Sequence, residues 1–141
     1  MEDRHVACTE IEGLPGHSFF AVFDGHGGDE AAIISAEHAT EGLLPRIMAQ
    51  KAIGLYTQSG CSDPQLLGQA MIAGFKECDA LMRPQISRSG TTAVTAFVTP
   101  THFICANAGD SRGVFCTGGD TNAPGGMVSG GVIAPGGVVA L

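Results

Sequence analysis

A short apolar run that ends in a glycine-rich loop constrains the fold of this chain more than any other feature. Residues 18–23 read SFFAVF, and the next five are Asp24, Gly25, His26, Gly27 and Gly28. A run this short, rich in aromatic and β-branched residues, predicts a buried strand. Glycines let the backbone turn sharply. We therefore expect a strand, a tight polar loop, and a helix that begins near Asp29, whose side chain could cap it.

The remaining body is expected to add one more helix and several strands. A second helix is predicted from Asp63, because Asp is a good N-cap and Pro64 suits the first helical position. Leu67 and Met71 then recur at helical spacing, and residues 51–62 are expected to form a loop. Further strands are predicted at residues 5–9, 91–99, 103–107 and 113–117, with a turn at 12–16. Strands grouped apart from helices indicate an α+β fold, a partial antiparallel β-sandwich flanked by helices.

The end of the sequence has a different composition from the body. Residues 118–141 contain eight glycines, and no charged residue follows Asp120. The tetrapeptide Ala-Pro-Gly-Gly occurs at 123 and again at 134. Such low complexity predicts a disordered tail, with neither strand nor helix. We therefore divide the chain into a body, residues 1–117, and a glycine-rich irregular tail, residues 118–141.

Charge and cysteine content exclude several classes of protein. The formal net charge is −7, with 14 acidic and 7 basic residues, which argues against a nucleic-acid or anionic-membrane partner. The five cysteines are odd in number and form no C-x-x-C pair, so we expect small core residues and neither a disulfide framework nor a zinc site. The chain shows no signal-peptide pattern and no apolar run that would span a membrane. A cytoplasmic or nuclear location is expected.

Three further polar segments accompany the glycine-rich loop. They are Glu2-Asp3 before the first strand, residues 89–93 (SGTTA) at the start of another, and residues 109–112 (GDSR) after a third. Each has a plain structural interpretation, such as a solvated strand end or a turn closed by an Asp110–Arg112 ion pair. The Asp24 loop has such an interpretation too, a glycine turn with a capping aspartate, but a carboxylate between an apolar strand and glycines is also typical of a site for oxygen-preferring divalent ions.

Taken together and in order, these segments resemble a known family. MED at 1–3, FAVFDGHGG at 20–28, SGTTAV at 89–94 and ANAGDSRG at 106–113 are similar to successive motifs of the type 2C metal-dependent serine/threonine protein phosphatases. The resemblance covers about residues 1–117, the N-terminal part of such a domain. It implies a β-sandwich with two Mg²⁺ or Mn²⁺ ions at one end. It also implies hydrolysis of phosphoserine and phosphothreonine in protein substrates by metal-activated water.

The resemblance also implies roles for particular residues. Asp24 would bridge the two ions, and the backbone carbonyl of Gly25 would bind one of them. Glu2 and Asp3 would hold a metal or metal-bound waters. His26 would protonate the departing serine or threonine oxygen, and Asp110 would contribute to a further, weaker metal site.

The sequence departs from the family pattern in ways that bear on activity. The family carries a phosphate-binding arginine shortly before its MED motif, and Arg4 is not that residue. No Asp or Glu follows Asp120, whereas the family has later metal-binding aspartates. We therefore expect a truncated chain that is inactive alone. The alternatives are a non-catalytic binding or regulatory fragment and an unstable fragment. A zinc hydrolase using His5, His26 and His38 is disfavoured, since no His-x-x-x-His spacing occurs.

Overall fold

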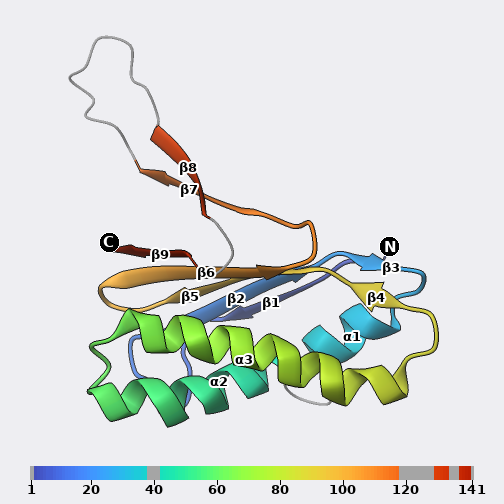
Figure 1. The fold of residues 1–141 in the computed structure, drawn as a ribbon, viewed down its shortest axis with the longest axis horizontal. Coiled ribbons are helices and arrows are strands. Elements are labelled where there is room, and N and C mark those ends of the chain that lie inside the picture. The colour runs from blue at the N-terminus through green and yellow to red at the C-terminus, as the bar shows by residue number, and fades with distance from the viewer. Residues whose placement is uncertain (1, 38–41, 118–128, 134–136, 141) are drawn as a thin grey trace.

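The computed structural model describes residues 2–37, 42–117, 129–133 and 137–140 (Figure 1). Its helical layer lies against one face of an antiparallel sheet. The elements are β1 (Arg4–Cys8), β2 (Ser18–Phe23), β3 (Gly25–His26), α1 (Glu30–Glu37), α2 (Leu43–Tyr56), η1 (Thr57–Ser59), α3 (Pro64–Met82), η2 (Arg83–Gln85), β4 (Gly90–Thr91), β5 (Ala93–Val98), β6 (His102–Ala108), β7 (Gly113–Thr117), β8 (Ser129–Ile133) and β9 (Gly137–Ala140). The α+β class with antiparallel sheets is confirmed.

The main sheet has the strand order β1-β2-β5-β6-β9, and every neighbouring pair is antiparallel. Its register places Phe19 opposite Phe97 and Phe20 opposite Ala96. Successive side chains on a strand point to opposite faces, so Phe19 and Phe97 are buried beneath the helices. Phe20 and Val22 point the other way and are 36% and 51% exposed. One face of the sheet is therefore core.

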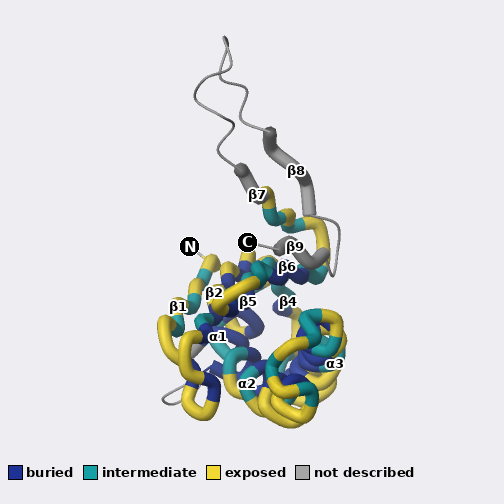
Figure 2. The backbone as a smooth tube through the Cα atoms, turned by 90° about the vertical axis from the view of Figure 1, so that its left-hand side faces the viewer, coloured by how far each residue is buried: buried dark blue, intermediate teal, exposed yellow. Residues whose placement is uncertain are grey.

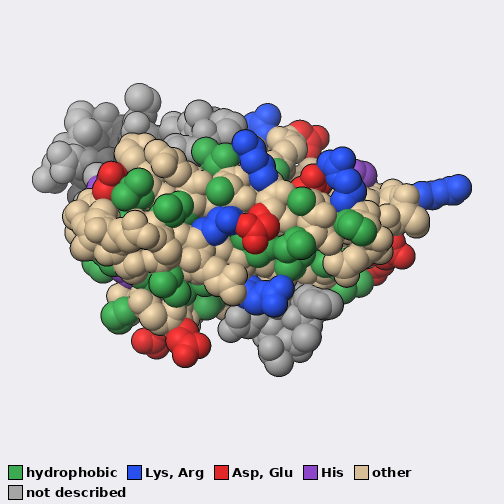
Figure 3. Space-filling view, turned by 60° about the horizontal axis from the view of Figure 1, so that its bottom comes forward, with side chains coloured by type: hydrophobic (Ala, Val, Ile, Leu, Met, Phe, Trp, Pro, Cys, Tyr) green, Lys and Arg blue, Asp and Glu red, His purple; other side chains and the backbone are tan. Residues whose placement is uncertain are grey.

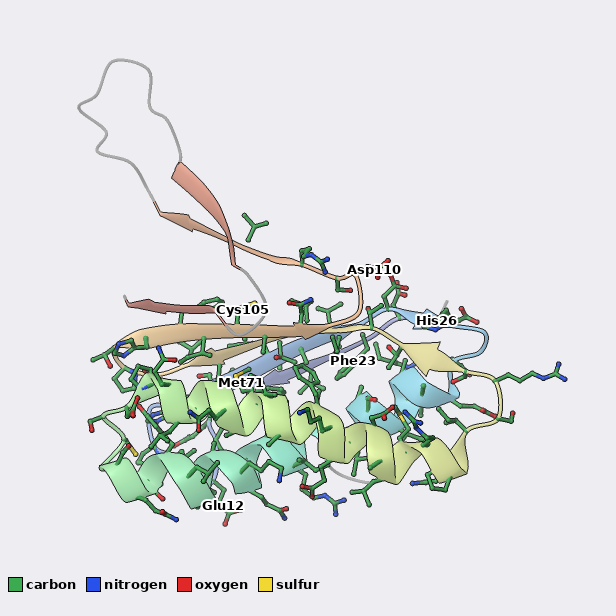
Figure 4. The ribbon with its side chains drawn as sticks, in the orientation of Figure 1. Glu12, Phe23, His26, Met71, Cys105 and Asp110 are labelled. Carbon is green, nitrogen blue, oxygen red and sulfur yellow. The ribbon has the colours of Figure 1, made fainter. Side chains whose placement is uncertain are left out.

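The helices complete this core. Asp63 caps α3 as predicted, because its carboxylate accepts a hydrogen bond of 2.9 Å from the Gln65 backbone N–H. The labelled Met71 and Phe23 lie between the helices and the sheet (Figure 4), and both are buried. On the outer side of the helices, basic, acidic and hydrophobic side chains are interspersed (Figure 3). Among the described residues, no helix has the length and apolar character needed to cross a membrane.

Helix α2 corrects the predicted loop at residues 51–62. The helix continues to Tyr56, so the first half of that loop is helical. Met48, Ala52 and Tyr56 recur every four residues and are all buried, which is the spacing of a core-facing helix stripe. Pro45 lies in the first turn of α2, where its missing N–H has no helical partner to lose. Pro45 is therefore compatible with the start of this helix.

The expected second sheet, packed face to face with the first, is not formed by the described residues. Strands β7 and β8 instead pair as a two-stranded ribbon that leads away from the main sheet (Figure 1). The turned view shows the same separation, with the helices on the opposite side of the sheet (Figure 2). The partial sandwich is thus, over the described ranges, one sheet covered on one face by helices.

The glycine-rich tail also differs from expectation where it is described. Residues 129–133 form β8, and residues 137–140 form β9, which pairs with β6. The prediction of no strand is wrong for these two stretches, because strand pairing uses backbone groups that glycine and valine both possess. Residues 118–128, 134–136 and 141 lie outside the described residues, so disorder there and the boundary at 117 stay predictions.

Candidate active site

The four polar segments singled out in the sequence meet near one end of the sheet. The loop after β2 forms β3, which pairs with β4 through Gly25 opposite Thr91 and His26 opposite Gly90. The labelled His26 and Asp110 lie at this same end (Figure 4), close to the N-terminus of the chain in Figure 1. The fold therefore brings together segments that are far apart in the sequence.

The glycine-rich loop is held by Glu2, which lies two residues before β1. The Gly28 backbone N–H donates a hydrogen bond of 3.0 Å to Glu2 Oε1. A Cβ at Gly25 would lie 2.5 Å from the backbone oxygen of Glu2, and contacts this short do not occur. Gly28 has a φ of 129°, a value that favours glycine. Glycine is thus required here for both close approach and turning.

Asp24 is exposed and is held through its backbone. Its carbonyl accepts a hydrogen bond of 2.9 Å from the Thr92 N–H, while its carboxylate faces solvent with those of Glu2 and Asp3, which are also exposed. The backbone bond fixes where the side chain starts and leaves the carboxylate oxygens accessible. An exposed carboxylate on a fixed backbone can accept a hydrogen bond or a cation.

Thr92 also connects the glycine-rich loop to the loop that carries Asp110. Thr92 Oγ1 lies 2.6 Å from Ser111 Oγ, and the Asn107 side-chain amide donates to the Ser111 carbonyl at 2.9 Å. Asp110 itself is exposed. Arg112 donates to the carbonyls of Gly109 and Ser111; an Asp110–Arg112 ion pair is absent among the described residues. The loop is therefore shaped by backbone contacts, and the Asp110 carboxylate is not held by Arg112.

The donors at this end suit a hard divalent ion in kind but not in number. Carboxylates and a backbone carbonyl are the ligands that such ions prefer. Over the described residues, however, no three His, Cys, Asp or Glu side chains lie close enough together to hold an ion. The same finding counts against the zinc alternative through His5 and His26, and His38 lies outside the described residues. The described residues thus present separate metal-type ligands and not a closed metal site.

Sequence reasoning missed the contacts of Ser89. Its hydroxyl accepts a hydrogen bond of 2.7 Å from the Ala31 N–H at the start of α1. The helix begins near Asp29, as predicted, because the Ile33 N–H bonds to the Asp29 carbonyl. The Asp29 carboxylate, the expected cap, instead lies 3.4 Å from Arg4 Nη2. A partner 58 residues away leaves no signal in local sequence.

The expectation of core cysteines holds for Cys78 and Cys105, which are buried, whereas Cys8 and Cys61 are partly exposed. Cys8, Cys61, Cys78 and Cys105 form no disulfide. Burial raises the pKa of the Cys78 thiol to about 11 and also raises the pKa of Cys105. A thiol is nucleophilic as its thiolate, so both are unreactive near neutral pH. Neither of these two thiols is therefore a candidate nucleophile.

Comparison with known proteins gives one consistent family. The family described as Protein phosphatase 2C matches residues 1–126. Mouse protein phosphatase 1B is 37% identical over 129 residues, which cover 84% of this chain and 32% of that protein. Protein phosphatase ppm-1.A of Caenorhabditis elegans is 39% identical over 126 residues, covering 81% of this chain and 26% of that protein. The chain thus spans about a third of the length of the curated relatives it matches.

A solved structure shows the same fold. The serine-threonine phosphatase 2C of Toxoplasma gondii superposes with a TM-score of 0.66 at 21% identity. The superposition covers 94% of this chain and 44% of that one. At this identity the likeness supports the fold of the chain and carries no argument about individual side chains.

Proposed function

The chain belongs to the protein phosphatase 2C family, and from this membership we propose that it carries the N-terminal part of a metal-dependent phosphatase site. The substrates proposed are proteins that bear phosphoserine or phosphothreonine. The reaction proposed is hydrolysis of the phosphate ester by water, without a phosphoenzyme. Because the chain spans about a third of its relatives' length, this activity is that of the whole site, to which these residues contribute.

One observation supports the proposal above the others. Glu2, the glycine-rich loop and the Asp110 loop are joined through Gly28 and Thr92 at one end of the sheet. One joint uses the Glu2 carboxylate and the others use backbone and hydroxyl groups, and Glu2, Asp24 and Asp110 are all exposed. Exposed carboxylates arranged in this way can bind cations, whereas carboxylates that only stabilise a turn would be bonded within it. Members of this family are generally metal-dependent, which accords with the donor chemistry.

Each residue can be given a proposed task. Mg²⁺ or Mn²⁺, when bound, lowers the pKa of a coordinated water toward about 7 and so supplies a nucleophile. Asp24 and the Gly25 carbonyl would hold ions, with Glu2 and Asp3 holding an ion or its waters and Asp110 aiding a further site. His26 is exposed, so its imidazole can give a proton to the serine or threonine oxygen that leaves.

A second function remains open, a binding or regulatory fragment without turnover. It is favoured by the finding that, over the described residues, no three candidate ligands gather around one point. Catalysis by a two-ion site requires both ions to be held about 3.5–4 Å apart. A chain that binds one ion or a substrate weakly would fit this alternative.

The proposal is tested by Mn²⁺ titration calorimetry on the chain. Binding is expected in the parent, and Asp24→Asn should weaken it by about tenfold or more. Asp79→Asn is the matched control, because Asp79 on α3 is also exposed but pairs with Arg83 of η2. Equal affinity in the parent and in Asp24→Asn would remove Asp24 from the site. A parent that binds no Mn²⁺ would count against the metal-dependent function of these residues.

A further inference from the structure

A buried serine connects the glycine-rich loop to a distant part of the chain. Ser89 is 9% exposed, and its hydroxyl oxygen accepts the Ala31 N–H at 2.7 Å. Ala31 is the second residue of α1, and the first N–H groups of a helix have no partner within the helix. The hydroxyl therefore satisfies a buried donor that the helix itself leaves without an acceptor.

The same segment is in close contact with the loop on which Asp24 and His26 lie. A Cβ at Gly27 would lie 2.7 Å from the carbonyl oxygen of Arg88, and a Cβ at Gly28 would lie 3.2 Å from Ser89 Cβ. Both glycines have positive φ, 68° and 129°. The loop is thus shaped against the backbone of residues 88 and 89, with no room for a larger residue at Gly27.

The next residue of the segment supports the His26 ring. His26 pairs with Gly90 between β3 and β4. A Cβ at Gly90 would lie 2.5 Å from His26 Nε2 and 2.9 Å from Cε1. The imidazole therefore lies against the Gly90 backbone, and the position of Gly90 limits how closely the ring can approach β4.

We propose that Ser89 is a positioning residue of the site, and that residues 88–90 act as a template for the glycine-rich loop. The Ser89 hydroxyl holds the start of α1 and, through it, one end of the loop, while Gly90 supports the His26 ring in the middle of the loop. This inference rests on the proposed function, because it assigns to Ser89 the placement of Asp24 and His26. Nothing in the hydrogen bond requires Ser89 to touch a metal or a substrate.

A second buried serine serves as a control that distinguishes a positioning role of Ser89 from a purely structural one. Ser35 is also buried, at 2% exposure, and lies on the same helix α1. Its hydroxyl donates to Met82 Sδ at 3.5 Å, which is away from the glycine-rich loop. Ser35→Ala removes a buried hydroxyl that α1 itself carries, and Ser89→Ala removes a buried hydroxyl that binds the start of α1. Only Ser89→Ala is expected to disturb the site.

The test uses NMR of the chain without and with Mn²⁺. In the metal-free chain, Ser89→Ala should shift the amide resonances of Gly27 and Gly28 and weaken the nuclear Overhauser contacts between the His26 ring and Gly90. Ser35→Ala should leave these signals in place. On Mn²⁺ titration, paramagnetic broadening of the loop amides should require about tenfold more metal in Ser89→Ala. Ser89→Thr, which keeps the hydroxyl, should restore most of the affinity.

The outcomes separate this inference from the proposed function. Unchanged loop signals in metal-free Ser89→Ala would overturn the template, whether or not the chain binds Mn²⁺. A parent that binds no Mn²⁺ would count against the function, while the metal-free spectra still decide the template. If Ser89→Ala does not fold, hydrogen exchange of the parent decides. The Ala31 amide should be protected like a mid-helix amide, and fast exchange there would overturn the proposal.

Discussion

Glycine is required by the structure at some positions of this chain and lowers its stability at others. Gly25 must approach the Glu2 backbone to within a distance that no Cβ permits, whereas a Cβ at Gly54 in α2 would meet no atom within 4 Å. The two positions therefore differ in what an added methyl group does. At Gly25 it would force β3 away from Glu2, and at Gly54 it would only restrict the unfolded chain.

We predict opposite effects of alanine at these two positions. Gly25→Ala should lower the free energy of unfolding by about 1–3 kcal/mol, the usual cost of overpacking. Gly54→Ala should raise it by about 0.5–1 kcal/mol, because glycine inside a helix is that much less favourable than alanine. Urea unfolding followed by circular dichroism measures both. A stable Gly25→Ala would mean that the loop has room to move.

Cys78 makes stability depend on pH at the alkaline end. Burial raises the pKa of its thiol from an ordinary 9.0 to about 11. The folded chain then keeps a proton that the unfolded chain releases, so stability is full below about pH 9 and falls as the pH rises toward 11. In Cys78→Ala this fall should be smaller, as measured by urea unfolding at about pH 8 and about pH 10.5.

A second truncation in the same helix serves as the control. Met71→Ala also removes a buried α3 side chain and should lower stability at every pH, because it leaves a cavity. It contains no titrating group, so its pH dependence should equal that of the parent. An equal alkaline fall in Cys78→Ala and Met71→Ala would assign the effect to other groups.

Among the secondary-structure elements, the N-cap of α3 is the contact that the sequence predicts most directly. Asp63→Ala should lower the free energy of unfolding by about 1 kcal/mol, because the Gln65 N–H loses its acceptor. Asp63→Ser should retain most of that stability, since serine is an equally good cap. Thermal or urea unfolding measures the difference. Equal stability of the alanine and serine variants would show that the cap contributes nothing.

Elements with a strong local pattern could be predicted, and those set by distant contacts could not. The strand at residues 18–23 was bounded correctly, because its apolar run and the following glycines both act locally. Helix α2 was not predicted, and residues 51–62 were expected to form a loop, because the burial of Met48 and Tyr56 that stabilises the helix depends on distant contacts. Strands β8 and β9 depend on partners, which their glycine-rich composition conceals.

The candidate site also has parts that the sequence predicts and parts that depend on distant contacts. The motifs around Asp24 and Asp110 identified which segments matter, and the structure places these segments at one end of the sheet. The roles of the individual residues stay predictions. The contact of Ser89 with Ala31 could not be predicted from the sequence. Ser89 lies just before a strand and Ala31 lies at the start of a helix, and no rule of sequence spacing relates two such positions.

For the molecule as a whole, we predict that turnover requires more chain than these residues. Against a phosphoserine peptide in Mn²⁺, the chain alone should be at least about 100-fold slower than one extended with the C-terminal region of mouse protein phosphatase 1B, since misplaced groups alone cost that much. Asp24→Asn in the extended chain is the control and should abolish the gain. Equal turnover by both chains would show that these residues hold a complete site.

The template at residues 88–90 also dictates when the site can form during synthesis. The glycine-rich loop leaves the ribosome before its partner, since Ala31 and Ser89 are 58 residues apart. At about 5–20 residues per second, the loop waits roughly 3–12 seconds for the segment that shapes it. During that interval β1 and β2 can pair as a hairpin, but β2 lacks its second neighbour β5. The nascent chain therefore carries an open strand edge and an unshaped loop, which is where a chaperone or a protease would meet it first.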